Sequence, residues 1–136
     1  METYAILYRS RAAAPLADAD IAQIALASAR GNARSAVTGV LLVSDISGGR
    51  ADLFVQWLEG ERAAVRALYD RIREDDRHAD CEVVAEGPTA DLVGRDGRLF
   101  PGWGMRFERV GTLPVTLDAF LADWLARPPT GDARTV

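Results

Sequence analysis

The sequence contains no lysine, one cysteine and one histidine. Arginine supplies all 16 positive charges, against 20 negative charges from aspartate and glutamate, so the net charge is −4. A broad nucleic-acid-binding face needs clustered cations that displace phosphate counterions, and this composition argues against one. A lone Cys81 excludes an internal disulfide, and with a lone His78 it leaves too few soft ligands for a protein-only metal site. We expect Cys81 to be a small buried hydrophobic residue in a strand.

Long apolar runs are also absent. No stretch approaches the roughly 20 apolar residues that a membrane-crossing helix needs. No basic segment followed by an apolar run stands at the N-terminus, so we expect a cytoplasmic protein with no membrane contact. A chain of 136 residues, 49% hydrophobic and 26% charged, has the make-up of one globular domain.

The common motifs of phosphate binding and hydrolysis are missing. No GxGxxG follows a strand-like run, and no GxxxxGK[ST] occurs. A Ser/His/Asp set could be built only around His78, which lies in a run of charged residues. We therefore expect a protein that is not an enzyme.

The residues that are present predict alternating strands and helices. A loop is expected at Arg9–Pro15, a hairpin connection at Ser44–Asp52 and a polar connection at Glu86–Arg98. We expect a first helix that begins at Asp18 or Asp20 and ends at Gly31. The other predicted elements are strands at Thr3–Tyr8, Val37–Val43, Leu53–Leu58, Cys81–Ala85 and Trp103–Val110, and a helix at Glu61–Asp75.

The order β-α-β-β-α-β-β predicts an α+β sandwich of the ferredoxin-like type, with a five-stranded mixed sheet and two helices on one face. Leu117–Leu125 can form one further amphipathic helix, which we expect to cover the other face of the sheet or to contact a second protomer. The expected organisation is a domain at 1–110, a capping or output helix at 111–127 and a disordered tail at 128–136.

One polar residue stands among apolar ones in the third predicted strand. Alternation places Gln56 on the same face as Phe54 and Leu58, with Val55, Trp57 and Glu59 on the opposite face. A buried amide needs polar partners, which the Tyr8 hydroxyl and the Asn32 amide could supply. The alternative is that Gln56 lies at an exposed edge or ties two strands together.

Several blocks of the sequence span residues 4 to 107. They are Leu7-Tyr8-Arg9-Ser10, Ala29-Arg30-Gly31-Asn32-Ala33-Arg34 with Val37-Thr38-Gly39-Val40-Leu41-Leu42, Phe54-Val55-Gln56-Trp57-Leu58-Glu59-Gly60, Val65 to Tyr69, Arg71-Ile72-Arg73-Glu74-Asp75-Asp76-Arg77-His78 and Arg98-Leu99-Phe100-Pro101-Gly102-Trp103-Gly104-Met105. In this order they resemble the BLUF family, the sensors of blue light that use FAD.

The resemblance implies a fold of the predicted order that holds FAD, or alternatively FMN, non-covalently between the two helices. Tyr8 and Gln56 match the family's photochemical tyrosine and glutamine. The other matching positions are Asn32, Ile24, Phe54, Arg71 and Asp75 at the flavin, and Trp103 and Met105 in signalling. Arg71 and Asp75, at i and i+4, can also form an ordinary exposed helix salt bridge.

The resemblance further implies a blue-light photoreceptor that regulates an unidentified partner protein in trans, with a possible homo-oligomer. Two segments, Ser44–Asp52 and Thr89–Gly97, are longer than is usual for the family, and Gly31 replaces a larger polar residue. These departures support one alternative, a flavin-free interaction domain of the same fold. A second alternative is a small flavin oxidoreductase, for which the sequence offers no nicotinamide site.

Overall fold

The computed structural model describes residues 2–17, 37–44, 50–75, 78–101, 106–110 and 113–125 of the chain. The described part combines a largely antiparallel sheet with separate helices, which confirms the α+β class. The elements are β1 (Tyr4–Ala17), β2 (Thr38–Ser44), β3 (Arg50–Gly60), α2 (Arg62–Glu74), β4 (His78–Pro88), α3 (Thr89–Val93), β5 (Arg106–Val110) and α4 (Leu117–Leu125).

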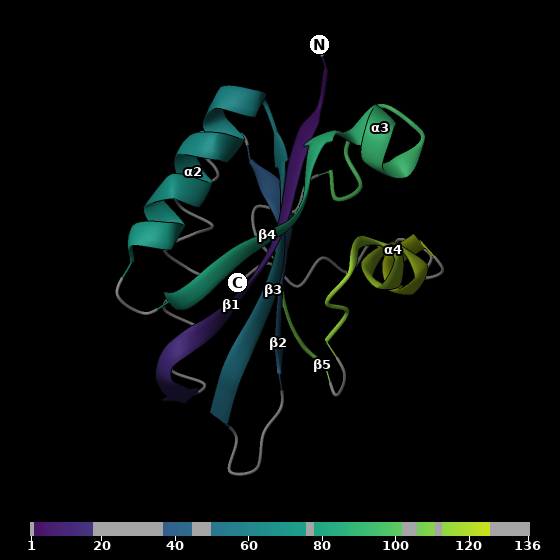
Figure 1. The fold of residues 1–136 in the computed structure, drawn as a ribbon. Helices are drawn as coiled ribbons and strands as arrows, with labels where there is room; N and C mark the ends of the chain where they lie inside the picture. Colours follow the sequence, from purple (N-terminus) through teal and green to yellow (C-terminus); the bar gives the residue numbers. More distant parts are fainter. Residues whose placement is uncertain are drawn as a thin grey trace.

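The strands form one sheet in the order β4-β1-β3-β2-β5 (Figure 1). β1 pairs antiparallel with β3 on one side and with β4 on the other, and β2 pairs antiparallel with β3. β5 runs parallel to β2 at the far edge. The helix expected to end at Gly31 lies outside the described residues. Of the two helices predicted on one face of the sheet, the structure therefore describes only α2.

The loop predicted at Arg9–Pro15 is wrong, because β1 continues through this segment to Ala17. The alanines and Pro15 suggested a break, yet β1 pairs with β3 as far as Arg11 and with β4 as far as Ala12, and it pairs with β3 again at Leu16. Proline lacks the N–H that a sheet ladder needs, and Pro15 falls where the β1–β3 register shifts, between Arg11 and Leu16. Tyr8 therefore lies in the middle of a strand and not at its end.

Alternation along the strands divides the buried residues between two faces of the sheet. One face packs against α2, whose Val65, Leu68 and Tyr69 are buried at helical spacing. The sheet residues of this first face are Tyr4, Ile6, Tyr8, Leu41, Val43, Phe54 and Leu58. The buried core of the second face is Ala5, Leu7, Val40, Leu42, Val55, Trp57, Phe100 and Phe120.

The polar connection predicted at Glu86–Arg98 is partly wrong. β4 extends to Pro88, and the short helix α3 follows at Thr89–Val93. Gly94 ends α3 in the left-handed region, with φ of 85°, and its N–H donates to the carbonyl of Ala90 at 3.1 Å. The sequence pattern did not predict α3, because a helix of one turn is too short to show a helical periodicity.

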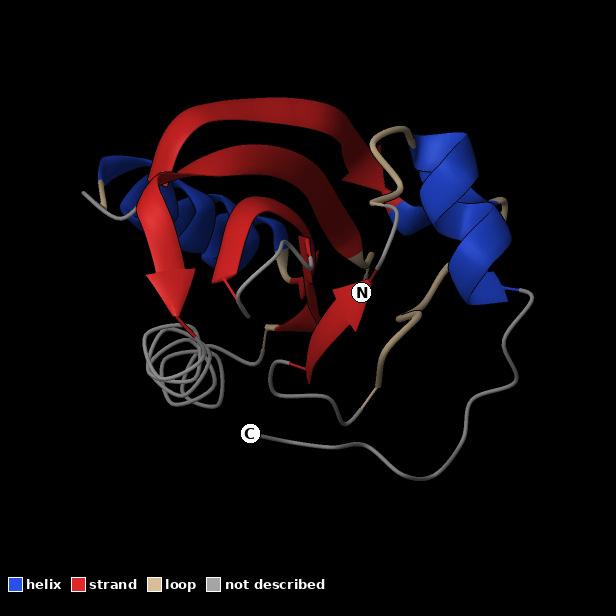
Figure 2. Cartoon of the chain, turned by 90° about the horizontal axis from the view of Figure 1, so that it is seen from below, coloured by secondary structure: helices blue, strands red, loops and turns tan. Residues whose placement is uncertain are grey.

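α4 occupies the predicted residues and covers the second face of the sheet. Phe120 is fully buried and stacks on Trp57 of β3, with ring centroids 5.3 Å apart and planes 9° apart. The sheet separates α2 on one side from α4 on the other, as the two views show (Figures 1 and 2). The side chain of Phe120 thus anchors α4 to the sheet.

Replacing Phe120 by alanine should lower the free energy of unfolding by about 3–5 kcal/mol, because it removes a fully buried aromatic ring and leaves a cavity. Urea unfolding of the full chain measures this. Val115→Ala is the matched control, since that side chain is 42% exposed and its loss should cost under about 0.5 kcal/mol. Equal losses in the two variants would show that Phe120 does not anchor α4.

Candidate functional site

The polar centre of the first face is a pair formed by Tyr8 and Gln56. The two residues are direct partners in the antiparallel β1–β3 register, so their side chains leave the sheet side by side. Both are buried. The Tyr8 hydroxyl donates a hydrogen bond to Gln56 Oε1. The exposed-edge interpretation of Gln56 is therefore wrong, and the amide has the phenol partner that the sequence suggested.

This hydrogen bond assigns a donor role to the Tyr8 side chain and an acceptor role to the Gln56 side chain. Tyr8 acts as the donor, so the Gln56 carbonyl is the acceptor and its NH2 group is the donor end of the amide. Burial raises the pKa of Tyr8 well above the ordinary value, and the negative charge of Asp75 adds to this effect. The phenol consequently keeps its proton at neutral pH.

The surroundings of the pair are apolar and aromatic. Phe54, which the sequence placed near the flavin ring, is buried on the same face. Tyr69 of α2 packs on Tyr8 with ring centroids 5.2 Å apart and planes tilted by 58°. Tyr69 falls within the helix predicted at Glu61–Asp75, and its i+4 spacing from Val65 was the available signal.

Tyr69 lies between Tyr8 and a surface groove of about 400 Å³ that α2 and β4 border. Cys81 lines the same groove from β4. It is only partly buried, so the expectation of a buried hydrophobic residue is wrong, because β4 is the edge strand of the sheet. Burial nonetheless raises the pKa of its thiol.

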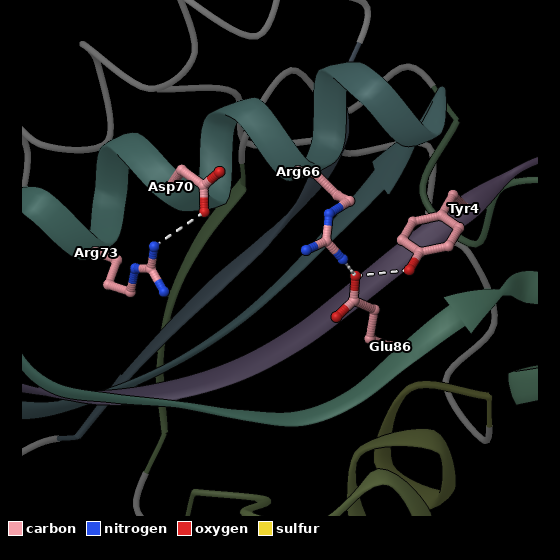
Figure 3. A network of polar contacts seen from close by, with 5 residues as sticks. All are labelled: Tyr4, Arg66, Asp70, Arg73 and Glu86. Carbon is pink, nitrogen blue, oxygen red and sulfur yellow. Dashed lines mark hydrogen bonds and ion pairs between the residues drawn. The ribbon is translucent and has the colours of Figure 1, made fainter.

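Polar contacts hold the start of α2 on the sheet (Figure 3). Glu86 of β4 accepts a hydrogen bond of 2.6 Å from the Tyr4 hydroxyl and forms an ion pair with Arg66 of α2. Farther along the helix, Arg73 pairs with Asp70 at 3.4 Å. The Glu86 contacts therefore link the first half of α2 to β1 and β4, whereas the Arg73–Asp70 pair lies within the helix; Tyr69, in its second half, packs on Tyr8.

The end of α2 carries two of the predicted flavin residues. Asp75 is the C-cap of the helix, and its N–H donates to the carbonyl of Ile72 at 3.0 Å. Its carboxylate is close enough to influence the pKa of Tyr8. Arg71 is exposed in the last turn of the helix. The pairing of Arg71 with Asp75 stays a prediction.

Four of the predicted site residues lie outside the described residues. They are Ile24, Asn32, Trp103 and Met105. The structure thus brings together Tyr8, Gln56 and Phe54, with Asp75 near them.

A buried carboxylate lies on the opposite face of β3. Glu59 is fully buried, and alternation in β3 placed it on that face without indicating a role. Burial raises its pKa, while hydrogen bonds from four donors act in the opposite direction. Alternation after Trp57 was the signal that could have found it.

Within the described ranges, no three His, Cys, Asp or Glu side chains gather as a metal site. Those ranges also hold no helix that is long and apolar enough to cross a membrane.

A buried phenol bonded to a buried amide, in an apolar layer between sheet and helix, fits a planar ligand with polar edges. The phenol offers a proton, and the amide offers both a donor and an acceptor. The chemistry of this donor set therefore fits the flavin that the resemblance implied.

Comparisons with known proteins identify the family. Residues 3–106 match the family model BLUF, described as sensors of blue-light using FAD. Photoactivated adenylate cyclase subunit beta of Euglena gracilis is 40% identical over 88 residues, which are 65% of this chain and 10% of that protein. The chain spans about a tenth of the length of the curated relatives that it matches.

Two solved structures resemble the fold. BlrB, a BLUF protein in its dark state, has a TM-score of 0.65 and 34% identity, over 96% of this chain and 86% of that chain. Klebsiella pneumoniae BlrP1 with FMN and cyclic diGMP has a TM-score of 0.68 and 24% identity, over 97% of this chain and 32% of that chain, and shows the fold alone. The family suggested by the sequence is confirmed: this chain belongs to the BLUF family of blue-light sensors.

Proposed function

We propose that this chain is a blue-light receptor that holds FAD without a covalent bond and signals through the Tyr8–Gln56 hydrogen bond. The observation that supports this most is the buried contact between a protonated phenol and an amide in a member of a blue-light-sensing family. The complete ferredoxin-like sandwich, with a second helix before β2, is part of the proposal.

When bound, the flavin supplies absorption of blue light and a strongly oxidising excited state. Tyr8 can release an electron and its hydroxyl proton, and Gln56 is the group that its hydroxyl contacts. The Gln56 amide exchanges its donor and acceptor ends by rotation or tautomerisation, which reverses its hydrogen bonds. In a buried site such a rearrangement is sufficient to hold a second state.

Other residues are proposed to hold and orient the cofactor. Asn32 binds the pyrimidine edge through its amide, and Ile24 and Phe54 contact the ring. Arg71 and Asp75 line its edge from the end of α2. The family description supports FAD, whereas the FMN in the BlrP1 structure supports the alternative flavin.

We propose that the output is a change in a partner protein and not a reaction at this chain. The family is one of sensors, and relatives such as the Euglena cyclase subunit are much longer proteins whose names state the output activity. Trp103 and Met105 are proposed to carry the change towards α4. A partner that acts in trans and a homo-oligomer remain part of this proposal.

Absorption of the purified full chain tests the proposed function against its alternatives. A flavin spectrum that shifts slightly to the red under blue light and returns in darkness is the expected result. Bleaching by a nicotinamide cofactor would instead indicate an oxidoreductase. A colourless protein that does not take up added FAD or FMN would indicate a flavin-free interaction domain.

Tyr8→Phe should leave the fold and the bound flavin in place and abolish the reversible red shift, because the ring still packs on Tyr69 but the hydroxyl is gone. Light-minus-dark absorbance of the loaded protein measures this. Tyr4→Phe is the matched control, since its hydroxyl contacts Glu86. A normal photocycle in the Tyr8 variant would contradict the assigned role.

Gln56→Leu should fold and show no light-minus-dark difference, because it removes the amide and keeps a side chain of similar size. The loss of one buried hydrogen bond should cost about 1 kcal/mol of stability, which urea unfolding resolves. If the leucine variant still switches, Gln56 is a structural amide that ties β1 to β3.

The proton on Tyr8 must be present for this chemistry. Burial is the largest cause that raises the pKa of all three tyrosines, Tyr4, Tyr8 and Tyr69. A raised folded-state pKa favours the neutral phenol. The stability that the neutral phenols contribute to the folded state is therefore present below the unfolded pKa of about 10, and it is lost as the pH rises through the folded value.

We expect no tyrosinate absorbance from the folded protein until the pH exceeds about 10, with Tyr8 the last to ionise. An ultraviolet titration of the wild type and of Tyr8→Phe measures this, and the variant should lack the last step. A tyrosinate that forms at neutral pH in the wild type, and not in the variant, would be inconsistent with a protonated Tyr8.

A further inference from the structure

Glu59 is a buried acid whose two carboxylate oxygens accept four hydrogen bonds. It is fully buried near the end of β3, three residues after Gln56 and on the opposite face of the sheet. Its Oε1 accepts from the Trp57 indole at 2.9 Å and from the backbone N–H of Leu99 at 2.7 Å. Its Oε2 accepts from the Thr38 hydroxyl at 3.0 Å and from the backbone N–H of Phe100 at 2.7 Å.

Two of these donors belong to the backbone of residues 98–101, which form neither strand nor helix. Because residues 98–101 belong to no strand, it is the Glu59 carboxylate that attaches this segment to the sheet. Arg98 adds a second attachment, because it donates to the Thr38 hydroxyl at 2.8 Å and to the Glu59 backbone carbonyl at 3.2 Å.

A glycine allows Thr38 to take part. Gly39 of β2 is paired with Leu58 of β3, and a Cβ at Gly39 would collide with the Trp57 carbonyl oxygen. The close approach of β2 to β3 brings the Thr38 hydroxyl within reach of the Glu59 carboxylate.

The segment held by Glu59 also contacts α4. The Phe100 ring meets the Phe120 ring edge-on, with centroids 6.2 Å apart and planes 66° apart. Phe120 stacks on Trp57, and the Trp57 indole donates to Glu59. Glu59, Trp57, Phe120 and Phe100 therefore close a ring of contacts, which we call the Glu59 ring.

The Glu59 ring and the Tyr8–Gln56 pair share a strand. Trp57 follows Gln56 directly in β3, so a movement of the strand at Gln56 also moves the indole on the other face. A carboxylate that accepts four hydrogen bonds at both oxygens is sensitive to such a shift, because each bond weakens steeply with misalignment.

We propose that Glu59 is the positioning residue that couples the light-sensing face to α4, by tying residues 98–101 to the strand that carries Gln56. This inference rests on the proposed function and adds a named route to it. Light changes the alignment of the Glu59 hydrogen bonds, and Phe100 transmits the change to Phe120.

Hydrogen exchange in dark and illuminated samples of the flavin-loaded full chain tests this, with absorbance recorded on the same samples. In the wild type, we expect light to change the protection of the Leu99 and Phe100 amides together with that of residues 117–123. This wild-type measurement needs no variant. A light response in α4 with no change at those two amides would overturn the inference.

Glu59→Gln is the direct variant, because glutamine keeps the shape but replaces one acceptor oxygen by an NH2 donor. It should keep the red shift, since Tyr8 and Gln56 lie on the other face. Dark exchange at Leu99 and Phe100 should rise about tenfold or more, and the light-dependent change in 117–123 should disappear. Glu82→Gln, at a 61% exposed side chain of β4, is the control and should change none of these.

The outcomes separate the two proposals. A wild type without a red shift overturns the proposed function, and this inference with it. A normal red shift with an unchanged light response of α4 in Glu59→Gln overturns this inference alone. If Glu59→Gln does not fold, Thr38→Val removes one donor to Oε2 and should raise exchange at Phe100 severalfold; unchanged exchange there would contradict the role of Glu59.

Discussion

The hydrogen bond between Tyr8 and Gln56 is the constraint on which the rest of the site depends. A buried amide and a buried phenol are costly unless each has a partner, and the register of β1 and β3 places them directly opposite one another. A shift of one residue in that register would send the two side chains to opposite faces. The pairing of β1 with β4 on its other side helps to hold the register.

β3 is the strand that connects the two faces of the molecule. Its even-numbered residues from Phe54 to Leu58 face α2, and the odd-numbered residues from Val55 to Glu59 face α4. The Tyr8–Gln56 pair and the proposed output surface at α4 are therefore separated by a single strand. One strand carries the amide on one side and the indole and carboxylate on the other.

The sequence was sufficient where periodicity or alternation is strong. Alternation in β3 predicted the shared face of Phe54 and Gln56, and helical spacing predicted α2 and α4. It failed at residues 9–15, because pairing with β3 and β4 continues past Tyr8 and pairing with β3 resumes after Pro15, which outweighs the local preference of alanine and proline. Alternation indicated the face of Glu59 but no role for it, since two of its four donors are backbone amides about 40 residues away, which no local pattern can indicate.

Infrared difference spectroscopy of the flavin-loaded protein, with isotope-labelled tyrosine rings, tests the central account most directly. Tyr4→Phe and Tyr69→Phe leave Tyr8 as the sole tyrosine, because the chain contains three. The account predicts a light-minus-dark band of the phenol C–O stretch that moves with the label. A normal red shift in a sample where the label moves no band would show that the Tyr8 hydrogen bond is not part of the switch.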